Sequence, residues 1–312
     1  MTYIARRIIM MIPVLFFLSI IVFSLIHLIP GNPAQVILGQ DASPSAIRAL
    51  EVQLGLNQSL PAQYFSWLAG VLHGNLGRSL LDGQPVSQLI MQRLPVTVEL
   101  AIGTIIVAIV IAFPLGILAA IYRDKWADVA TLFVATVGIS VPPFWLGMLL
   151  LIEFTVKIHL FPSSGYEPIW SHPLQNLSVM TLPIVATGFR EAGVLLRMLR
   201  GSLLDVLDQE FIRTARSKGI SGWKVIFHHA VKNALIPVIT TGGLQVAGLL
   251  GGIVITETIF SLPGFGSLLV ESVFSRDYTT IQGTALVAAL AVVLVNLLVD
   301  ITYGLVDPRM RT

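Results

Sequence analysis

The sequence predicts an all-α integral membrane protein with six transmembrane helices and both termini in the cytoplasm. Of its 312 residues, 55% are hydrophobic and only 12% are charged, whereas a soluble globular protein carries about 25% charged residues. The mean hydropathy is +0.84. Six segments are long and apolar enough to cross a bilayer, and lysine and arginine concentrate in the connections on one side.

Each of the six segments is expected to be a helix. Backbone groups in lipid find no water to bond, and the period-two alternation of a barrel strand is missing. The first segment follows Arg6 and Arg7 and runs for about 22 residues, longer than the apolar region of a signal peptide, so we expect it to be retained. The expected helices are residues 8–29, 96–122, 129–156, 178–199, 235–258 and 281–306.

The orientation follows from the positions of the basic residues. With the N-terminus in the cytoplasm, 13 of the 19 lysines and arginines lie inside, five lie outside, and Arg190 lies within a helix. Cytoplasmic connections of membrane proteins carry an excess of lysine and arginine. The sequence therefore places both termini inside.

The long connections divide the chain into two parts. Residues 1–95 are predicted to form a transmembrane helix and an extracytoplasmic segment with short helices near residues 45–54 and 61–72. Residues 96–307 are predicted to form a helical core with a charged cytoplasmic connection at 201–234. A second outer connection at 260–282 contains the turn sequence Leu262-Pro-Gly-Phe-Gly266.

Several kinds of chemistry have no support in the sequence. There is no cysteine, which excludes disulfides and thiolate sites, and no two of the six histidines have the i, i+4 spacing of a helical zinc site. Neither a phosphate-binding G-x-x-x-x-G-K-[ST] loop nor a G-x-S-x-G nucleophile elbow occurs. We therefore expect no cofactor, no metal, no catalytic residue and no nucleic-acid partner.

Polar residues inside the apolar segments are candidates for function. A charge near the bilayer centre costs about 2.5–3.5 kcal/mol on insertion scales, so such residues face water or partners rather than lipid. They either line a pathway or hold helices together, and the sequence weighs these interpretations about evenly. For Asp300, near the inner end of the last helix, contact between helices is favoured. The candidates are Arg190, Glu191, Gln245, Asn296 and Asp300.

Small residues recur at four-residue steps in the fifth segment, at Gly243, Ala247 and Gly251, with a G-x-x-x-G pair at Gly248 and Gly252. Small side chains let helix backbones approach closely in lipid. Tight helix packing is the favoured interpretation, and a packed gate that slides is the alternative.

The inner connection carries the most informative motif, Phe211-Ile-Arg-Thr-Ala-Arg-Ser-Lys-Gly-Ile-Ser-Gly-Trp223. It resembles the cytoplasmic "EAA" loop of binding-protein-dependent ABC importer permeases, specifically the dipeptide/oligopeptide/nickel group. Arg213 stands where the general pattern has an acid, and Val231-Lys232 where it has Leu-Pro, as is typical of this group. The residues that the resemblance assigns to coupling with an ATPase are Arg213, Thr214, Ala215, Gly219 and Trp223.

Fragments along nearly the whole chain are similar to the first-permease type of this group. They include the first segment ending in His27-Leu-Ile-Pro-Gly-Asn-Pro33, Gly74-Asn-Leu-Gly77 with Ser79, residues 257–266, Arg276-Asp-Tyr278, and a tail containing Asn296, Asp300, Tyr303 and Asp307-Pro308-Arg309. Each fragment is weak alone, and their order and spacing carry the resemblance.

The resemblance implies the type I ABC importer transmembrane domain in a bacterial inner membrane. It also implies a second, related permease chain, two ATP-binding subunits on the cytoplasmic face and an extracytoplasmic substrate-binding protein. Substrates of this group include dipeptides, oligopeptides, glutathione-like peptides and nickel chelates, and the sequence does not distinguish among them. A secondary transporter or channel that needs no ATPase, and a membrane enzyme, are the alternative classes.

Local pattern adds a prediction for the shape of the inner connection. Residues 211–218 are expected to form a short helix that ends at a left-handed Gly219, and Ser221 is expected to cap a second helix over residues 222–233. Trp223, Ile226, Phe227 and Ala230 would then form one apolar stripe, suited to a groove on a partner. The alternative is a solvated loop whose charge only sets the topology.

Overall fold

The computed structural model describes residues 2–28, 33–38, 42–53 and 55–306. Within these ranges the chain is helical and contains no strand, apart from an isolated bridge between Arg78 and Pro85. The chain divides into two compact units, one made of residues 1–95 with 263–294 and the other of residues 96–262 with 295–312. The second outer connection and much of the last helix thus group with the N-terminal part.

The first unit contains α1 (Thr2–Leu28), α2 (Pro33–Leu38), α3 (Pro44–Gln53) and α4 (Leu60–Leu72). It also holds the start of α5 (Val86–Ile121), α12 (Phe265–Phe274) and the start of α13 (Tyr278–Val306). Helices α3 and α4 agree with the two short helices expected in the outer segment. Their unit has a core of its own, formed by Val86, Ile90, Phe265 and Leu268.

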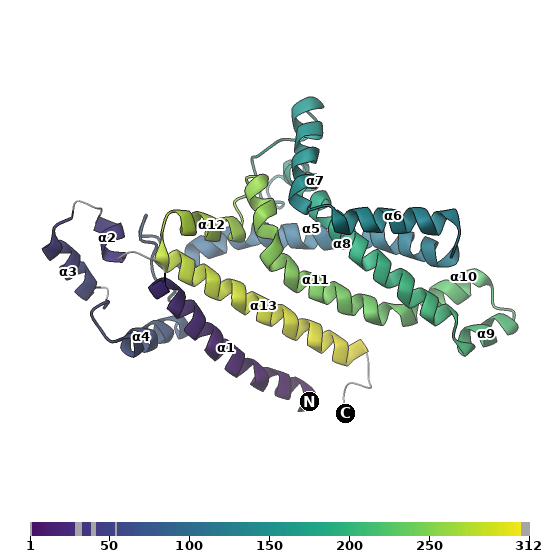
Figure 1. The fold of residues 1–312 in the computed structure, drawn as a ribbon, viewed down its shortest axis with the longest axis horizontal. Coiled ribbons are helices and arrows are strands. Elements are labelled where there is room, and N and C mark those ends of the chain that lie inside the picture. Colours follow the sequence, from purple (N-terminus) through teal and green to yellow (C-terminus); the bar gives the residue numbers. More distant parts are fainter. Residues whose placement is uncertain (1, 29–32, 39–41, 54, 307–312) are drawn as a thin grey trace. The chain divides into compact units, whose positions relative to one another are not determined.

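The second unit is built around α8 (Pro173–Leu207), which packs against α6 (Trp126–Ser140), α7 (Pro143–Leu150) and α11 (Val231–Ile259) (Figure 1). Small residues permit the contact between α6 and α8. A Cβ added at Gly193 would lie 2.6 Å from the carbonyl oxygen of Ala135, and one at Gly138 would lie 2.8 Å from that of Phe189. In each contact a glycine of one helix therefore lies directly against the backbone of the other.

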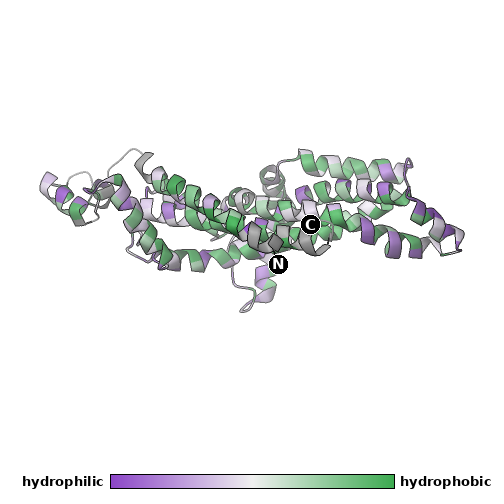
Figure 2. Ribbon diagram, turned by 90° about the horizontal axis from the view of Figure 1, so that it is seen from below, coloured by the Kyte–Doolittle hydropathy of each residue, from purple (hydrophilic) through white to green (hydrophobic). Residues whose placement is uncertain are grey.

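Among the described residues, three helices are long and apolar enough to cross a membrane unbroken: α5, α8 and residues 278–299 of α13. Two further candidates are bent, one by 98° between α6 and the segment 143–157, the other by 52° within α11. The described apolar part of α1 covers Ile9–Leu25. Apolar residues dominate these helices, and polar residues gather where α9 and α10 connect α8 to α11 (Figure 2).

The prediction of one straight helix over residues 129–156 is wrong. Helix α6 ends at Ser140, and α7 with a π-helix over Leu151–Lys157 leaves at the 98° bend. Pro142 and Pro143 cause the break, because proline lacks an N–H donor and keeps the preceding residue out of the helical region. Val141 accordingly has extended backbone angles.

Several helix ends also differ from the prediction. Helix α5 begins at Val86 rather than Val96 and continues through Pro95, and α8 extends from Pro173 to Leu207 rather than from Ser178 to Leu199. The added residues at these helix ends are more polar than the apolar segments from which the spans were predicted. Hydropathy detects the part of a helix that fits in lipid and not the part that continues beyond it.

Candidate functional site

The inner connection, residues 201–234, folds into two short helical segments joined by a turn. Helix α9 covers Glu210–Ser217, close to the expected 211–218. The second segment begins at α10 (Gly222–Lys224), continues as a π-helix over Val225–Ala230, and runs directly into α11. Ser221 is the N-cap residue, as predicted, although its side chain makes no capping hydrogen bond.

The turn after α9 depends on Gly219. Its φ is +75°, a left-handed conformation that glycine adopts without steric cost. The Gly219 amide donates to the carbonyl of Arg216 at 2.9 Å, and the Ile220 amide donates to that of Ala215 at 3.3 Å. These two bonds form a Schellman motif, which satisfies the free carbonyls at the end of a helix. The predicted left-handed glycine is confirmed.

Buried side chains hold this turn against the end of α8. Ile212, Ala215, Val225 and Ala230 are buried in one cluster with Leu203 and Val206 of α8. The expected stripe is therefore wrong at Ala230, which faces the interior, whereas Trp223 and Phe227 face outward. The π-helix accounts for the difference, because its wider turn brings Val225 and Ala230, five residues apart, onto the same inner face.

The outward face of the inner connection is aromatic and basic. The rings of Trp223 and Phe227 are in contact, with centroids 4.2 Å apart and planes tilted by 41°, and their exposed fractions are 67% and 41%. Phe211 on α9 is also exposed. Arg213 forms an exposed ion pair with Glu210 at 2.8 Å and Thr214 donates to the Glu210 carbonyl, while the remaining basic residues, Arg216, Lys218 and Lys224, are exposed as well. We call this surface the coupling face.

A buried ion pair, which the sequence did not reveal, ties the turn between α5 and α6 to α8. Arg200 donates from Nε and Nη2 to the two carboxylate oxygens of Asp128, both at 2.6 Å. Asp128 is 3% exposed and also accepts the backbone N–H of Asp124 at 3.0 Å. Charge and sequence position gave no signal that residues 72 apart would pair.

Three of the predicted polar residues lie together. Arg190 on α8 donates to the buried carboxylate of Glu191 at 2.9 Å, and Gln245 on α11 donates to the backbone carbonyl of Glu191 at 3.0 Å. The Arg190 side chain is 48% exposed, and Gln245 Oε1 is buried without a partner. The cluster thus joins α8 to α11 and presents a guanidinium on its open side.

The other predicted residues are dispersed. Asn296 is exposed on α13, and the side chain of Asp300 lies outside the described ones. A Cβ at Gly243 would meet Val299 at 2.6 Å, so α11 and α13 approach closely there. Ala247 is half-buried, and a Cβ at Gly251 would meet no described residue of another helix within 4 Å, so tight helix packing at Gly251 is not found in the described part of the chain.

A second set of buried polar groups, missed from the sequence, lies between α5, α8 and α11. Glu257 of α11 is fully buried and accepts a hydrogen bond from Thr97 of α5, and Thr187 of α8 bonds Thr256 of α11 at 3.2 Å. Tyr166 donates to Glu99 at 2.8 Å, and burial together with this carboxylate raises the pKa of Tyr166 well above its usual range. The hydroxyl therefore stays protonated and able to donate.

In the first unit, Asp277 connects the two outer segments. Its carboxylate accepts from Ser79 Oγ at 2.6 Å and from the Leu80 amide at 3.2 Å. It also caps α13 by accepting from the amide and hydroxyl of Thr280 at 3.2 and 2.7 Å. This carboxylate is the physical link between the Gly74–Ser79 and Arg276–Tyr278 motifs.

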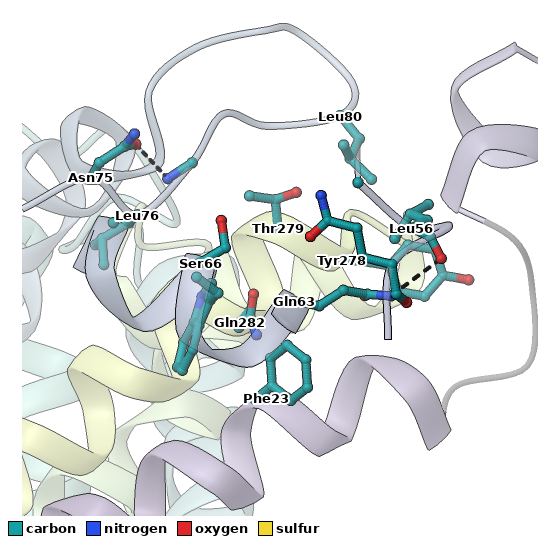
Figure 3. Close-up of a pocket in the computed structure, with 15 residues that line it drawn as sticks. Phe23, Leu56, Gln63, Ser66, Asn75, Leu76, Leu80, Tyr278, Thr279 and Gln282 are labelled. Carbon is teal, nitrogen blue, oxygen red and sulfur yellow. Dashed lines mark hydrogen bonds between the residues drawn. The ribbon is translucent and has the colours of Figure 1, made fainter. Parts of the chain in front are cut away.

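A cavity of about 460 Å³ opens beside this link (Figure 3). Its wall combines the aromatic rings of Phe23 and Trp67 with amide and hydroxyl groups of Gln63, Ser66 and Gln282. Gln63 donates to the carbonyl of Leu56 at 3.2 Å, which holds the segment before α4 in place. The outer segments thus form a structured surface rather than loose connections.

Comparison with known proteins identifies the family. Residues 112–312 match the family model of the binding-protein-dependent transport system inner membrane component, and residues 1–101 match the model of the N-terminal part of the same kind of membrane component. The two matches cover both parts of the chain. The inner connection with its coupling face lies within the first of them.

Relatives and solved structures agree with this match. The chain is 44% identical to a peptide transport system permease protein of Brucella abortus, over 99% of this chain and 98% of the relative. It is 41% identical to a dipeptide transport system permease protein of Alkalihalophilus pseudofirmus over 100% and 99%, and 38% identical to a glutathione transport system permease protein of Escherichia coli K12, again over 100% and 99%.

The fold is similar to the MetNI methionine ABC transporter in inward-facing conformations, with a TM-score of 0.58 at 15% identity over 70% of this chain and 97% of that one. An amino acid ABC transporter gives a TM-score of 0.52 at 13% identity over 70% and 94%. The all-α architecture is thus that of a type I importer transmembrane domain, as predicted. The chain belongs to the binding-protein-dependent transport system inner membrane components, the permease subunits of ABC importers.

Proposed function

We propose that this chain forms half of the translocation pathway for a peptide-like solute, which an extracytoplasmic binding protein delivers. Relatives that align over nearly their whole length are named as permeases for peptides, dipeptides and glutathione, all of which are short peptides. A permease that acts without an ATPase is not favoured by these relatives. The chain itself does no chemistry, and ATP hydrolysis belongs to separate subunits.

The coupling face is the observation that carries the proposal. The exposed aromatic pair lies on a short helical segment that buried side chains hold in place. Such a pair suits a groove on a partner, because apolar anchors surrounded by charge are typical of binding hot spots. Two ATP-binding subunits would meet this face and the equivalent face of a second, related permease. In this assignment Gly219, Ala215 and Thr214 shape the turn, Trp223 makes contact, and Arg213 adds charge.

The proposed membrane arrangement has six spans in a bacterial inner membrane, with both termini in the cytoplasm. It takes α1 as the first span and each bent pair as one span. Residues 1–95 then supply the first helix and outer segment, and residues 96–307 supply the core. Asn296 and Asp300 either contact neighbouring helices or border the pathway.

We propose that the outer segments of the first unit receive the binding protein. The two outer segments are held together by Asp277, so they move as one surface. Asp82 and Phe274 are exposed, and because the chain has no cysteine of its own, single cysteines at these positions are clean crosslinking probes. Ser267 is buried and does not suit this use. Absence of crosslinks to the binding protein from both positions would contradict the assignment.

The function is tested by reconstituting the chain with its second permease, ATPases and binding protein in proteoliposomes. Uptake of a di- or tripeptide should require ATP and the binding protein, and vanadate should stop it. Gradient-driven uptake by the chain alone would instead favour a secondary transporter. Peptide turnover in detergent without partners would favour an enzyme.

A further inference from the structure

One face of α8 stays open although the helix is the most enclosed of the three unbroken candidate spans among the described residues. In the most apolar window of α8, 67% of the residues are buried, against 33% in α5 and 22% in α13. Residues that share one side of a helix recur at steps of three and four. On α8 the open or half-buried positions with this spacing are Arg190, Val194, Arg197, Met198, Gly201 and Asp205.

The inner half of this face is hollowed into a groove. The groove has a volume of about 540 Å³, and Ile139 of α6 and Pro237 of α11 form its sides. Val194, Arg197, Met198, Gly201, Ser202 and Asp205 of α8 line its floor. Apart from the adjoining backbone of α8 itself, no atom of the described residues lies within 4 Å of a Cβ built at Gly201, so the middle of the floor is open.

Opposite charges stand at the two ends of the groove. Arg197 and Asp205 are separated by about 12 Å along the helix axis, at 1.5 Å per residue. Arg190 lies about 10 Å beyond Arg197, and the buried Glu191 carboxylate orients its guanidinium. Arg190 lies within the apolar fourth segment, whereas Arg197 and Asp205 lie toward its cytoplasmic end, and charges in such positions are tolerated where they face water or polar partners rather than lipid.

We infer that this groove, together with Arg190, lines the translocation pathway and selects for zwitterionic short peptides. The inference rests on the proposed transport function. Arg197 binds the solute carboxylate, because a guanidinium pairs with a carboxylate through two parallel hydrogen bonds. Asp205 receives the ammonium group. An extended peptide spans about 3.3–3.6 Å per residue, so a tripeptide reaches most of the distance between the two charges.

Cysteine accessibility tests the pathway directly. Single cysteines replace Val194, Met198 and Gly201 in the complete importer, with Val110→Cys on the exposed apolar side of α5 as the control. A membrane-impermeant, charged thiol reagent on the cytoplasmic side should modify the three groove cysteines at least about 10-fold faster than the one at Val110. Equal, slow modification of all four, or crosslinking of the groove cysteines to the second permease, would overturn the inference.

Charge selectivity tests the role of Arg197. Uptake of trialanine and of trialanine amide is compared in complexes that carry native chain, Arg197→Gln or Arg197→Lys. Arg197→Gln should reduce uptake of the free acid about 10-fold while changing that of the amide less than about 2-fold, and Arg197→Lys should retain at least half of the native rate. The binding protein is native throughout, so its own preference cancels in the ratio of variant to native.

The outcomes separate this inference from the proposed function. Suppose that the native complex shows ATP-dependent uptake, and that Arg197→Gln leaves uptake unchanged or lowers it equally for both solutes. That result would refute the charge assignment and leave the proposed function intact. If the native complex takes up neither solute, the peptide assignment fails, and the cysteine measurement still decides whether the groove lies on a water-filled pathway.

Discussion

At the scale of single residues, the Asp128–Arg200 pair is a buried, doubly hydrogen-bonded ion pair in the second unit. Both carboxylate oxygens are used, and Asp128 is almost fully enclosed. Removing one partner of such a pair leaves a charge without compensation, which costs about 3–5 kcal/mol when the pair is fully buried. Arg200 retains some contact with solvent, so the lower end of that range applies here.

Asp128→Asn should therefore lower the melting temperature of the detergent-purified complex, and Asp128→Asn combined with Arg200→Gln should restore part of the loss. Asp208→Asn is the matched control, because Asp208 makes only an exposed ion pair with Arg123 at 3.6 Å, a contact worth about 0–1 kcal/mol. Equal effects of Asp128→Asn and Asp208→Asn would show that the buried pair does not hold α6 to α8.

At the scale of elements, the turn between α9 and α10 positions the coupling face. Its shape depends on the left-handed φ of Gly219, which a β-branched residue adopts only at a cost of about 1–2 kcal/mol or more. Gly222, three residues later, begins α10 and has open space around its Cβ position, without a positive φ. The same substitution at the two glycines therefore separates backbone strain from added bulk.

Gly219→Val should abolish ATP-dependent uptake and weaken co-purification of the ATP-binding subunits, while Gly222→Val retains most of both. Membrane insertion, followed by the amount of chain in the membrane fraction, should be native in both variants. A Gly219→Val chain with native uptake would indicate that the inner connection is a solvated loop rather than a coupling element.

The aromatic pair gives a second test of the same element. Trp223→Ala with Phe227→Ala removes the two exposed, contacting rings without changing the buried anchors Ile212 and Val225. Co-purification of the ATP-binding subunits should fall about 10-fold or more, as expected for hot-spot aromatics. Trp126→Ala is the control, because Trp126 is 82% exposed at the start of α6. A similar fall in co-purification for Trp126→Ala would show that Trp223 and Phe227 have no specific role in binding the ATP-binding subunits.

At the scale of the whole molecule, the distribution of basic residues predicts the topology. Reporter fusions after Lys125 and Gly219 should be cytoplasmic, and a fusion after Ser171 should be external, because cytoplasmic connections carry the excess of lysine and arginine. The 98° bend after Ser140 makes the connection that contains Ser171 the critical one. If Ser171 were cytoplasmic, the bent segment 126–157 would re-enter rather than cross, and the six-span arrangement would fail.

The sequence by itself determined the membrane class, the existence of most helices, the left-handed glycine and the family. These features depend on composition, on apolar run length and on short motifs, which are local properties of the chain. Its hydropathy also placed the end of the first apolar core segment near Ile121, where α5 ends. The two prolines at 142 and 143 indicate a helix break, but the apolar run continues through them, and run length alone predicted a single helix.

Only the tertiary structure decided which distant residues meet. The pairs Asp128–Arg200 and Ser79–Asp277 join residues 72 and 198 positions apart, and pairing across such distances is set by how helices pack rather than by any local pattern. The inward turn of Ala230 likewise depends on a π-helix that the α-helical period does not anticipate. The open face of α8 is visible only when its neighbours are in place, because exposure is a property of what the other helices leave uncovered.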